Sequence, residues 1–137
     1  MRSNVYFVNL RTRNQNSNKI TKIRNLFDKA GFQKVLSQDD LTAVKIHFGE
    51  LGSDGYINPV FVRQVIDKIK ETGAKPFLTD TNTLYSGSRA NAVDHTNTAI
   101  LHGFDAAVIG APIVIADGLK GENATDVVIG KKHFKTT

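Results

Sequence analysis

The stretch Leu41-Thr42-Ala43-Val44-Lys45-Ile46-His47-Phe48, residues 41–48, decides the fold. In its second half, apolar residues alternate with Lys45 and His47. Successive side chains of a strand point to opposite faces, so this alternation predicts a strand that carries Lys45 and His47 on one face. The glycine-rich segment Gly49–Gly55 follows as a loop. Asn58-Pro59 then supplies the cap and first-turn residues of a helix.

The remainder of the chain repeats this alternation of strands and helices. Apolar residues at helical spacing predict helices over Ile20–Ala30, Pro59–Glu71 and Asn91–His102. Short apolar runs predict further strands at Val5–Leu10, Phe77–Thr79, Ala106–Ile109 and Ile113–Ile115, and a short C-terminal hairpin over Asp126–Phe134. We therefore predict an α/β fold with a mainly parallel sheet of about four to five strands and flanking helices.

Length and composition indicate one globular domain that spans residues 1–137. The chain has 40% hydrophobic and 23% charged residues, which argues against a disordered or fibrous protein. No apolar run approaches the roughly 18 residues of a membrane span, and the apolar run near the N-terminus is too short for a signal peptide. The absence of cysteine agrees with a reducing compartment and excludes disulfides and thiolate metal sites. We expect a cytoplasmic protein without membrane contact.

The net charge of +5 permits an anionic ligand. The basic residues gather near the two ends of the chain and do not form a block with interleaved aromatic residues. This distribution argues against nucleic-acid binding. A small-molecule or anionic ligand is the partner that we expect.

The candidate site lies where the predicted strands end, because ligands of open parallel sheets bind beyond the carboxyl ends of the strands. Lys45 and His47 side by side on an apolar strand cost desolvation unless they meet an anion or a polar cavity. The alternative is an edge strand whose polar side chains reach solvent. We predict that Lys45, His47, Asp80 and Arg89 converge on one cavity.

The polar loop after Thr79 supplies most of the remaining candidates. Asp80 fits a metal ligand or a general base, with Asn82 and Tyr85 as hydrogen-bonding partners, although Asp and Asn also commonly cap turns. Arg89 fits a bidentate partner for phosphate or carboxylate, or equally a partner for a surface acid. The loop 49–55 matches no known phosphate motif, and its two acidic residues would repel an anion.

The histidines of the third predicted helix do not form a metal site with each other. His95 and His102 are seven residues apart, which is about 10.5 Å along a helix, whereas zinc-binding helices place histidines four apart. His95 follows Asp94 and is expected near the rim of the polar cavity, with Asn82 and Tyr85. If a metal binds, we expect Asp80 and His47 to be its ligands.

Five segments carry a resemblance to a known family. They are Val44–Glu50, Phe77–Tyr85, Asn91–His95, Ile115–Gly121 and Lys132–Lys135. In this order they resemble the N-terminal part of the uncharacterised iron-sulfur-centre protein family, a domain of unknown function that is often followed by a ferredoxin-like [4Fe-4S] module. The resemblance extends from about Val5 to Lys135.

The resemblance implies that this chain is an N-terminal fragment of a longer family domain. It also implies that any 4Fe-4S cluster belongs to the C-terminal region of that domain, because this chain contains no cysteine and therefore no cluster cofactor of its own. We therefore predict a ligand- or metal-binding α/β domain of a redox-linked protein, and we assign no reaction to it. Its site residues are Lys45, His47, Asp80, Asn82, Tyr85, Arg89 and His95. The alternative is a non-catalytic docking domain for a ferredoxin-like electron-transfer partner.

Overall fold

A parallel sheet forms the centre of the computed structural model, which describes residues 3–133. The strands are β1 (Leu41–Lys45), β2 (Lys75–Asp80) and β3 (Ile113–Ile115), and they lie in the order β1-β2-β3. Both neighbouring pairs are parallel. The predicted α/β class with a mainly parallel sheet is therefore confirmed, with three strands in the described residues instead of four to five.

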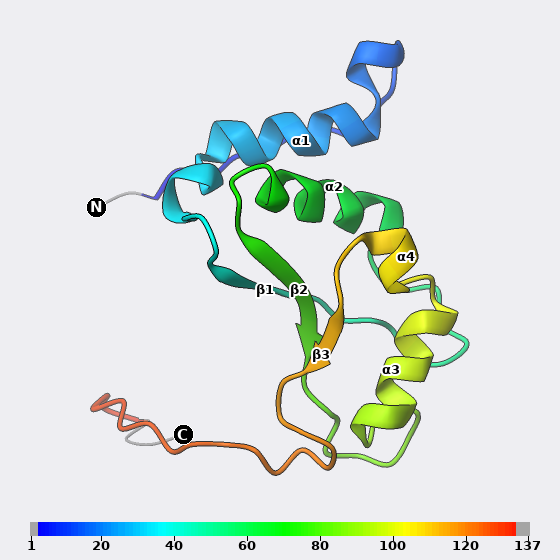
Figure 1. The fold of residues 1–137 in the computed structure, drawn as a ribbon, viewed down its shortest axis with the longest axis vertical. Coiled ribbons are helices and arrows are strands. Elements are labelled where there is room, and N and C mark those ends of the chain that lie inside the picture. The colour runs from blue at the N-terminus through cyan, green and yellow to red at the C-terminus, as the bar shows by residue number, and fades with distance from the viewer. Residues whose placement is uncertain (1–2, 134–137) are drawn as a thin grey trace.

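Helices connect the strands and cover the sheet (Figure 1). They are α1 (Lys19–Ala30), α2 (Pro59–Lys70), α3 (Ala92–Leu101) and the short α4 (Ala106–Ile109), with 3-10 turns at Gln15–Ser17 and Phe32–Val35. The three predicted helices are confirmed to within a residue at each end.

An asparagine side chain caps the N-terminus of each long helix. The Asn58 side chain accepts from the Val60 N–H at the start of α2, and the Asn91 side chain accepts from the Val93 and Asp94 N–H groups at the start of α3. A cap of this type stabilises a helix by about 1 kcal/mol. It also fixes where α3 begins, which positions the buried residues of that helix against the sheet.

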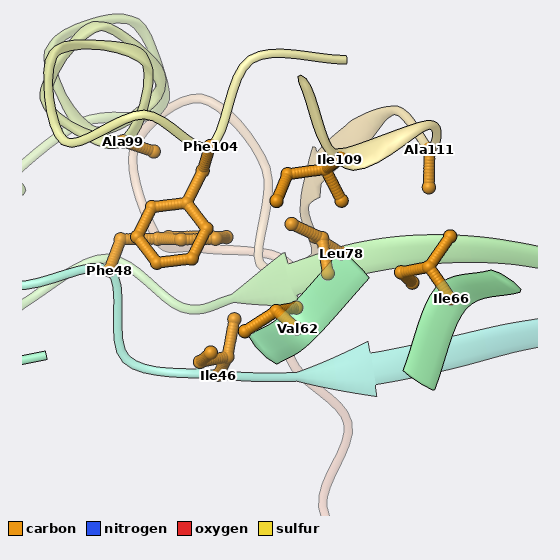
Figure 2. Packing of buried hydrophobic residues seen from close by; sticks show 9 residues of the cluster. All are labelled: Ile46, Phe48, Val62, Ile66, Leu78, Ala99, Phe104, Ile109 and Ala111. Carbon is orange, nitrogen blue, oxygen red and sulfur yellow. The ribbon is translucent and has the colours of Figure 1, made fainter. Parts of the chain in front are cut away.

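The main core lies between the sheet and α2, α3 and α4 (Figure 2). Its buried residues are Ile46, Phe48, Val62, Ile66, Leu78, Ala99, Phe104, Ile109 and Ala111. The rings of Phe48 and Phe104 pack edge to face, with centroids 5.2 Å apart. Burial of one such side chain contributes about 1.5–3 kcal/mol. A second cluster, built around Phe27 of α1 and Ile69 of α2, joins these two helices.

The N-terminal run Val5–Leu10 was predicted to be a buried strand, and this prediction was wrong. The run forms no strand, and Val5 and Phe7 are 91% and 85% exposed. A strand forms only beside a neighbouring strand, because its backbone N–H and C=O groups must be paired. The periodicity of so few residues does not show whether such a neighbour exists.

Ala106–Ile109 was also predicted to be a strand but forms helix α4. The Asp105 side chain accepts from the Ala107 N–H, and Gly110 ends the helix in the left-handed region at φ 78°. A cap and a terminal glycine on either side of a short apolar run therefore specify a helical turn. Burial of Ile109 fixes this turn against the core.

The predicted hairpin over Asp126–Phe134 does not form in residues 126–133, where Val128 is an isolated bridge residue and no strand is present. Phe134 lies outside the described residues. Figure 1 shows the chain after β3 leaving the sheet as an extended tail. Within residues 3–133, no helix has the length and apolar character that crossing a bilayer requires.

Candidate functional site

The candidate site begins where β1 and β2 end. Lys45 is the last residue of β1 and pairs in register with Thr79, one residue before the end of β2. The Ile46 N–H donates to the Thr79 carbonyl at 3.1 Å, so the parallel pairing continues past β1. Because Ile46 and Phe48 are buried in the main core, the residues that alternate with them, Lys45 and His47, lie on the opposite side.

Asp80, the last residue of β2, lies at the centre of the site. Its side chain is 6% exposed, and both carboxylate oxygens have polar neighbours. Oδ1 lies 3.0 Å from Lys45 Nζ and accepts from the Thr81 N–H at 2.9 Å. Oδ2 lies 3.5 Å from an Arg89 nitrogen and 3.9 Å from His47 Nδ1. Lys45, His47 and Arg89, three of the predicted site residues, thus surround one buried carboxylate.

Asp80 is ionised at neutral pH. Burial raises the pKa of its carboxyl group, but the polar contacts with His95 and Lys45 and the hydrogen bond from the Thr81 N–H outweigh burial and hold that pKa at about 2. A carboxylate that is stabilised so strongly is a weak proton acceptor. The environment of Asp80 therefore favours a role in holding the surrounding cations over a role as general base.

Arg89 connects Asp80 to the glycine-rich loop. Its side chain is 7% exposed, and Nε donates to Glu50 Oε1 at 3.0 Å while NH2 contacts the same oxygen and donates to the Tyr85 hydroxyl at 2.9 Å. NH1 lies 3.0 Å from Nδ1 of His47. A guanidinium only donates, so Nδ1 of His47 accepts and the neutral ring carries its proton on Nε2.

Glu50 is a member of the site that sequence reasoning did not select. Hydrogen bonds from Arg89 and Tyr85 hold the pKa of the Glu50 carboxyl at about 2. In the sequence, Glu50 appears only as an acidic residue in a glycine-rich loop. Its position directly after Gly49, at the end of the strand that carries His47, was the available signal.

His95 lies beneath the site and not at its rim as predicted. Its side chain is 0% exposed, its ring packs edge-on against Phe48, and Nε2 lies 3.6 Å from Asp80 Oδ2. Neither ring nitrogen has a hydrogen-bond partner among the described residues. His95 therefore joins helix α3 to the end of β2 below Asp80, where a ligand entering from solvent cannot touch it.

Asn82 is not part of this cluster. Its backbone N–H and its side-chain Nδ2 both donate to the carboxylate of Asp117, and Nδ2 donates to the Gly118 carbonyl at 2.8 Å. These bonds join the loop after β2 to the loop after β3. Asn82 and Asp117 thus shape the edge of the sheet from outside the charged cluster.

Lys45 and His47, whose side chains are 65% and 51% exposed, face solvent together with Glu50 and Tyr85. An ammonium group has three donors, and the structure assigns one of those of Lys45 to Asp80. The Nε2–H of the neutral His47 ring is a further donor. Lys45, His47, Asp80 and Arg89 therefore lie together, but at a site that is open to solvent and not enclosed.

A metal at Asp80 and His47 is not favoured by this geometry. The Arg89 guanidinium lies within 3.5 Å of both the Asp80 carboxylate and the His47 ring, where a cation would have to bind. Among residues 3–133, no group of three His, Asp or Glu side chains is arranged to hold a metal ion. Since the chain has no cysteine, its donor set does not fit an iron-sulfur cluster either.

An apolar cavity of about 330 Å³ lies apart from this site, between α1 and β1. Its lining includes Phe27, Phe32 and Val44, and no charged side chain borders it. Thr42 is the one side chain with a polar group in its lining, so the cavity suits an apolar occupant better than an anionic one.

Comparison with known proteins gives one match. The family model described as Domain of unknown function (DUF362) matches residues 42–137, which include every member of the charged cluster. No curated protein and no solved structure matches the chain.

Proposed function

The chain belongs to the DUF362 family of domains of unknown function, and we propose that it is a ligand-binding α/β domain whose site takes a small anionic molecule at Lys45 and His47. The observation that carries this proposal is the convergence of Lys45, His47 and Arg89 on the buried carboxylate of Asp80.

The cluster has the features of a prepared anion site. Asp80 and Arg89 are buried, with side chains 6% and 7% exposed, and they compensate each other's charge. Asp80 also holds Lys45 Nζ at 3.0 Å, which restricts a side chain that is otherwise free in solvent. A donor that is held in place before binding loses less entropy when a ligand arrives. The arrangement therefore directs its open donors toward solvent.

The ligand is a carboxylate or phosphate compound, because the open groups are donors. Lys45 Nζ and His47 Nε2–H both donate, and the acidic side chain nearest to them, Asp80, is shielded from solvent. Charge-assisted hydrogen bonds of this kind are about twice as strong as neutral ones. The proposal concerns binding, and it assigns no reaction.

The redox context is a further part of the proposal. The motifs around Lys45 and Asp80 resemble those of iron-sulfur-centre proteins, which supports a partner or module that carries a [4Fe-4S] cluster outside this chain. The alternative role, a docking surface for a ferredoxin-like partner, needs exposed Lys and Arg side chains and no convergence of polar groups. The burial of Arg89 and Asp80 within one cluster favours the ligand site.

The proposal is tested by titrating the ¹⁵N-labelled chain with inorganic phosphate and with acetate, while the dissociation constant is followed by NMR. We expect Lys45→Gln and His47→Ala each to weaken binding of the preferred anion by about tenfold, because the first removes the positive charge and the second removes the ring donor. If both variants bind the anion as tightly as the unmodified chain, the proposal is wrong.

Lys75→Gln is the matched control. Lys75 is also an exposed strand lysine paired with an aspartate, Asp39, at 2.7 Å, but it begins β2 at the opposite end of the sheet. A purely electrostatic effect of net charge would change binding equally in Lys45→Gln and Lys75→Gln. The proposed site requires that only Lys45→Gln weakens binding.

A further inference from the structure

Glu50 occupies donors that face the proposed ligand site. Its Oε1 accepts from Nε of Arg89 at 3.0 Å, from NH2 of Arg89 and from the Tyr85 hydroxyl. Three donors from two side chains therefore already hold a carboxylate group. All three donors converge on one carboxylate oxygen, so Arg89 and Tyr85 together bind a carboxylate through charge-assisted hydrogen bonds.

Glu50 can leave these donors more easily than Arg89 can. The Glu50 side chain is 41% exposed, whereas that of Arg89 is 7% exposed and is also in contact with Asp80 and His47. Rotation of the Glu50 side chain alone is enough to move its carboxylate into water. Gly49 precedes Glu50 and is buried, so the movement is confined to the Glu50 side chain.

The geometry of these contacts leads us to infer that Glu50 is an internal competitor for the ligand, and that a carboxylate of the ligand replaces it on Arg89 and Tyr85. This inference rests on the proposed function. Arg89 also contacts Nδ1 of His47, whose other ring nitrogen, Nε2, is one of the two donors proposed to bind the anion. The ligand thus carries two anionic groups, one at Lys45 and His47 and a carboxylate at Arg89.

Glu50 pairs with the buried guanidinium of Arg89 when no ligand is bound. An unpaired buried charge is costly, and in the free protein Glu50 supplies a second counter-charge to Arg89 beside that of Asp80. The ligand must then offer an acceptor that binds Arg89 and Tyr85 at least as strongly as the Glu50 carboxylate does, since a weaker acceptor would not displace Glu50. The exchange therefore requires the ligand to carry an anionic group at the Arg89 end of the site.

The test is an NMR titration with succinate, a dicarboxylate, of the unmodified chain and of Glu50→Gln, which keeps the shape of the side chain and removes its charge. We expect Glu50→Gln to bind succinate at least about tenfold tighter, because a charge-assisted competitor is removed. Glu122→Gln is the matched control, since Glu122 is exposed and distant in sequence from the cluster, and we expect it to bind as the unmodified chain does.

Succinate binding by the Glu50 and Lys45 variants distinguishes the internal competitor from the anion site. If Glu50→Gln binds succinate no better than the unmodified chain while Lys45→Gln binds it more weakly, the internal competitor is refuted and the anion site stands. If Lys45→Gln leaves succinate binding unchanged, both proposals fail. If no chain binds succinate while the unmodified chain binds phosphate, the internal competitor is refuted and the anion site stands.

A second readout does not depend on the variant. In the unmodified chain, the carboxyl ¹³C resonance of Glu50 should move on saturation with succinate, as the side chain leaves Arg89 for water. A Glu50 resonance that stays fixed while the amides of residues 45–47 respond to succinate would refute the displacement.

Discussion

The imidazole of His95 lies completely buried with its Nε2 3.6 Å from Oδ2 of Asp80, although His95 belongs to helix α3 and Asp80 to the end of strand β2. The contact joins the helical layer to the edge of the sheet at the base of the candidate site. Asp80 thus lies near the buried His95 through Oδ2 and pairs with the exposed Lys45 through Oδ1. The carboxylate that pairs with the exposed Lys45 thus also packs against a side chain that is closed to solvent.

Replacement of His95 by alanine should destabilise the protein by about 2–4 kcal/mol, because it creates a buried cavity and removes a polar neighbour of Asp80. The measurement is the free energy of unfolding in urea. Val93→Ala is the control, since Val93 lies on the same helix but is 60% exposed, and we expect it to change this free energy by less than about 0.5 kcal/mol. Equal effects of the two substitutions would contradict the buried contact.

Acid should remove a contribution of Asp80 to stability. Its pKa in the folded protein is about 2, below the ordinary value of 3.8. A lowered folded-state pKa stabilises the protein above the ordinary value, and this stabilisation is lost as the pH falls from 3.8 toward 2. The difference corresponds to about 2 kcal/mol. We expect the free energy of unfolding of Asp80→Asn to depend less on pH in this window than that of the unmodified chain; the same slope in both would contradict the assignment.

The two phenylalanines Phe7 and Phe104 should differ sharply in their effect on stability. Phe104 is 0% exposed within the main core, and Phe104→Ala should cost about 3–5 kcal/mol. Phe7 is 85% exposed, and Phe7→Ala should change the free energy of unfolding by less than about 0.5 kcal/mol. A large loss of stability in Phe7→Ala would show that the N-terminal run is buried after all, as its sequence predicts.

Arg89→Lys should destabilise the cluster although it preserves the charge. The guanidinium contacts Glu50, Tyr85, His47 and Asp80 at once, and an ammonium group cannot reach this set. We expect a loss of about 1.5–3 kcal/mol in the free energy of unfolding, the range of hydrogen bonds to charged groups. Arg13→Lys is the control, because Arg13 is exposed. If both substitutions are neutral, Arg89 does not organise the site.

Part of the site could be predicted from local patterns. The alternation of Val44, Ile46 and Phe48 with Lys45 and His47 shows that the two polar residues share a face, and parallel topology brings the end of that strand close to Asp80. These two arguments need only neighbouring residues and a general rule of sheet geometry. They are therefore independent of the details of packing.

The remainder depends on long-range packing that a single sequence does not reveal. Glu50 meets Arg89 only because the loop after β2 folds back over the loop after β1, a contact across 39 positions. His95 is drawn beneath Asp80 by burial of the inner face of α3. The short apolar runs at Val5–Leu10 and Ala106–Ile109 fit a strand or a helix equally by periodicity, so neighbouring contacts and caps decide between them.

The location of a bound anion tests the central claim most directly. Crystals of the chain soaked with arsenate, a tetrahedral phosphate analogue that scatters anomalously, would show it without ambiguity. We predict an anomalous peak for the arsenic atom beside Lys45 and His47. The oxygens of this arsenate should lie about 3 Å from Lys45 Nζ and from the nearest nitrogen of the His47 ring. A peak confined to the basic residues Arg11, Arg13 and Lys22 of the N-terminal region, or no peak at all, would contradict the account.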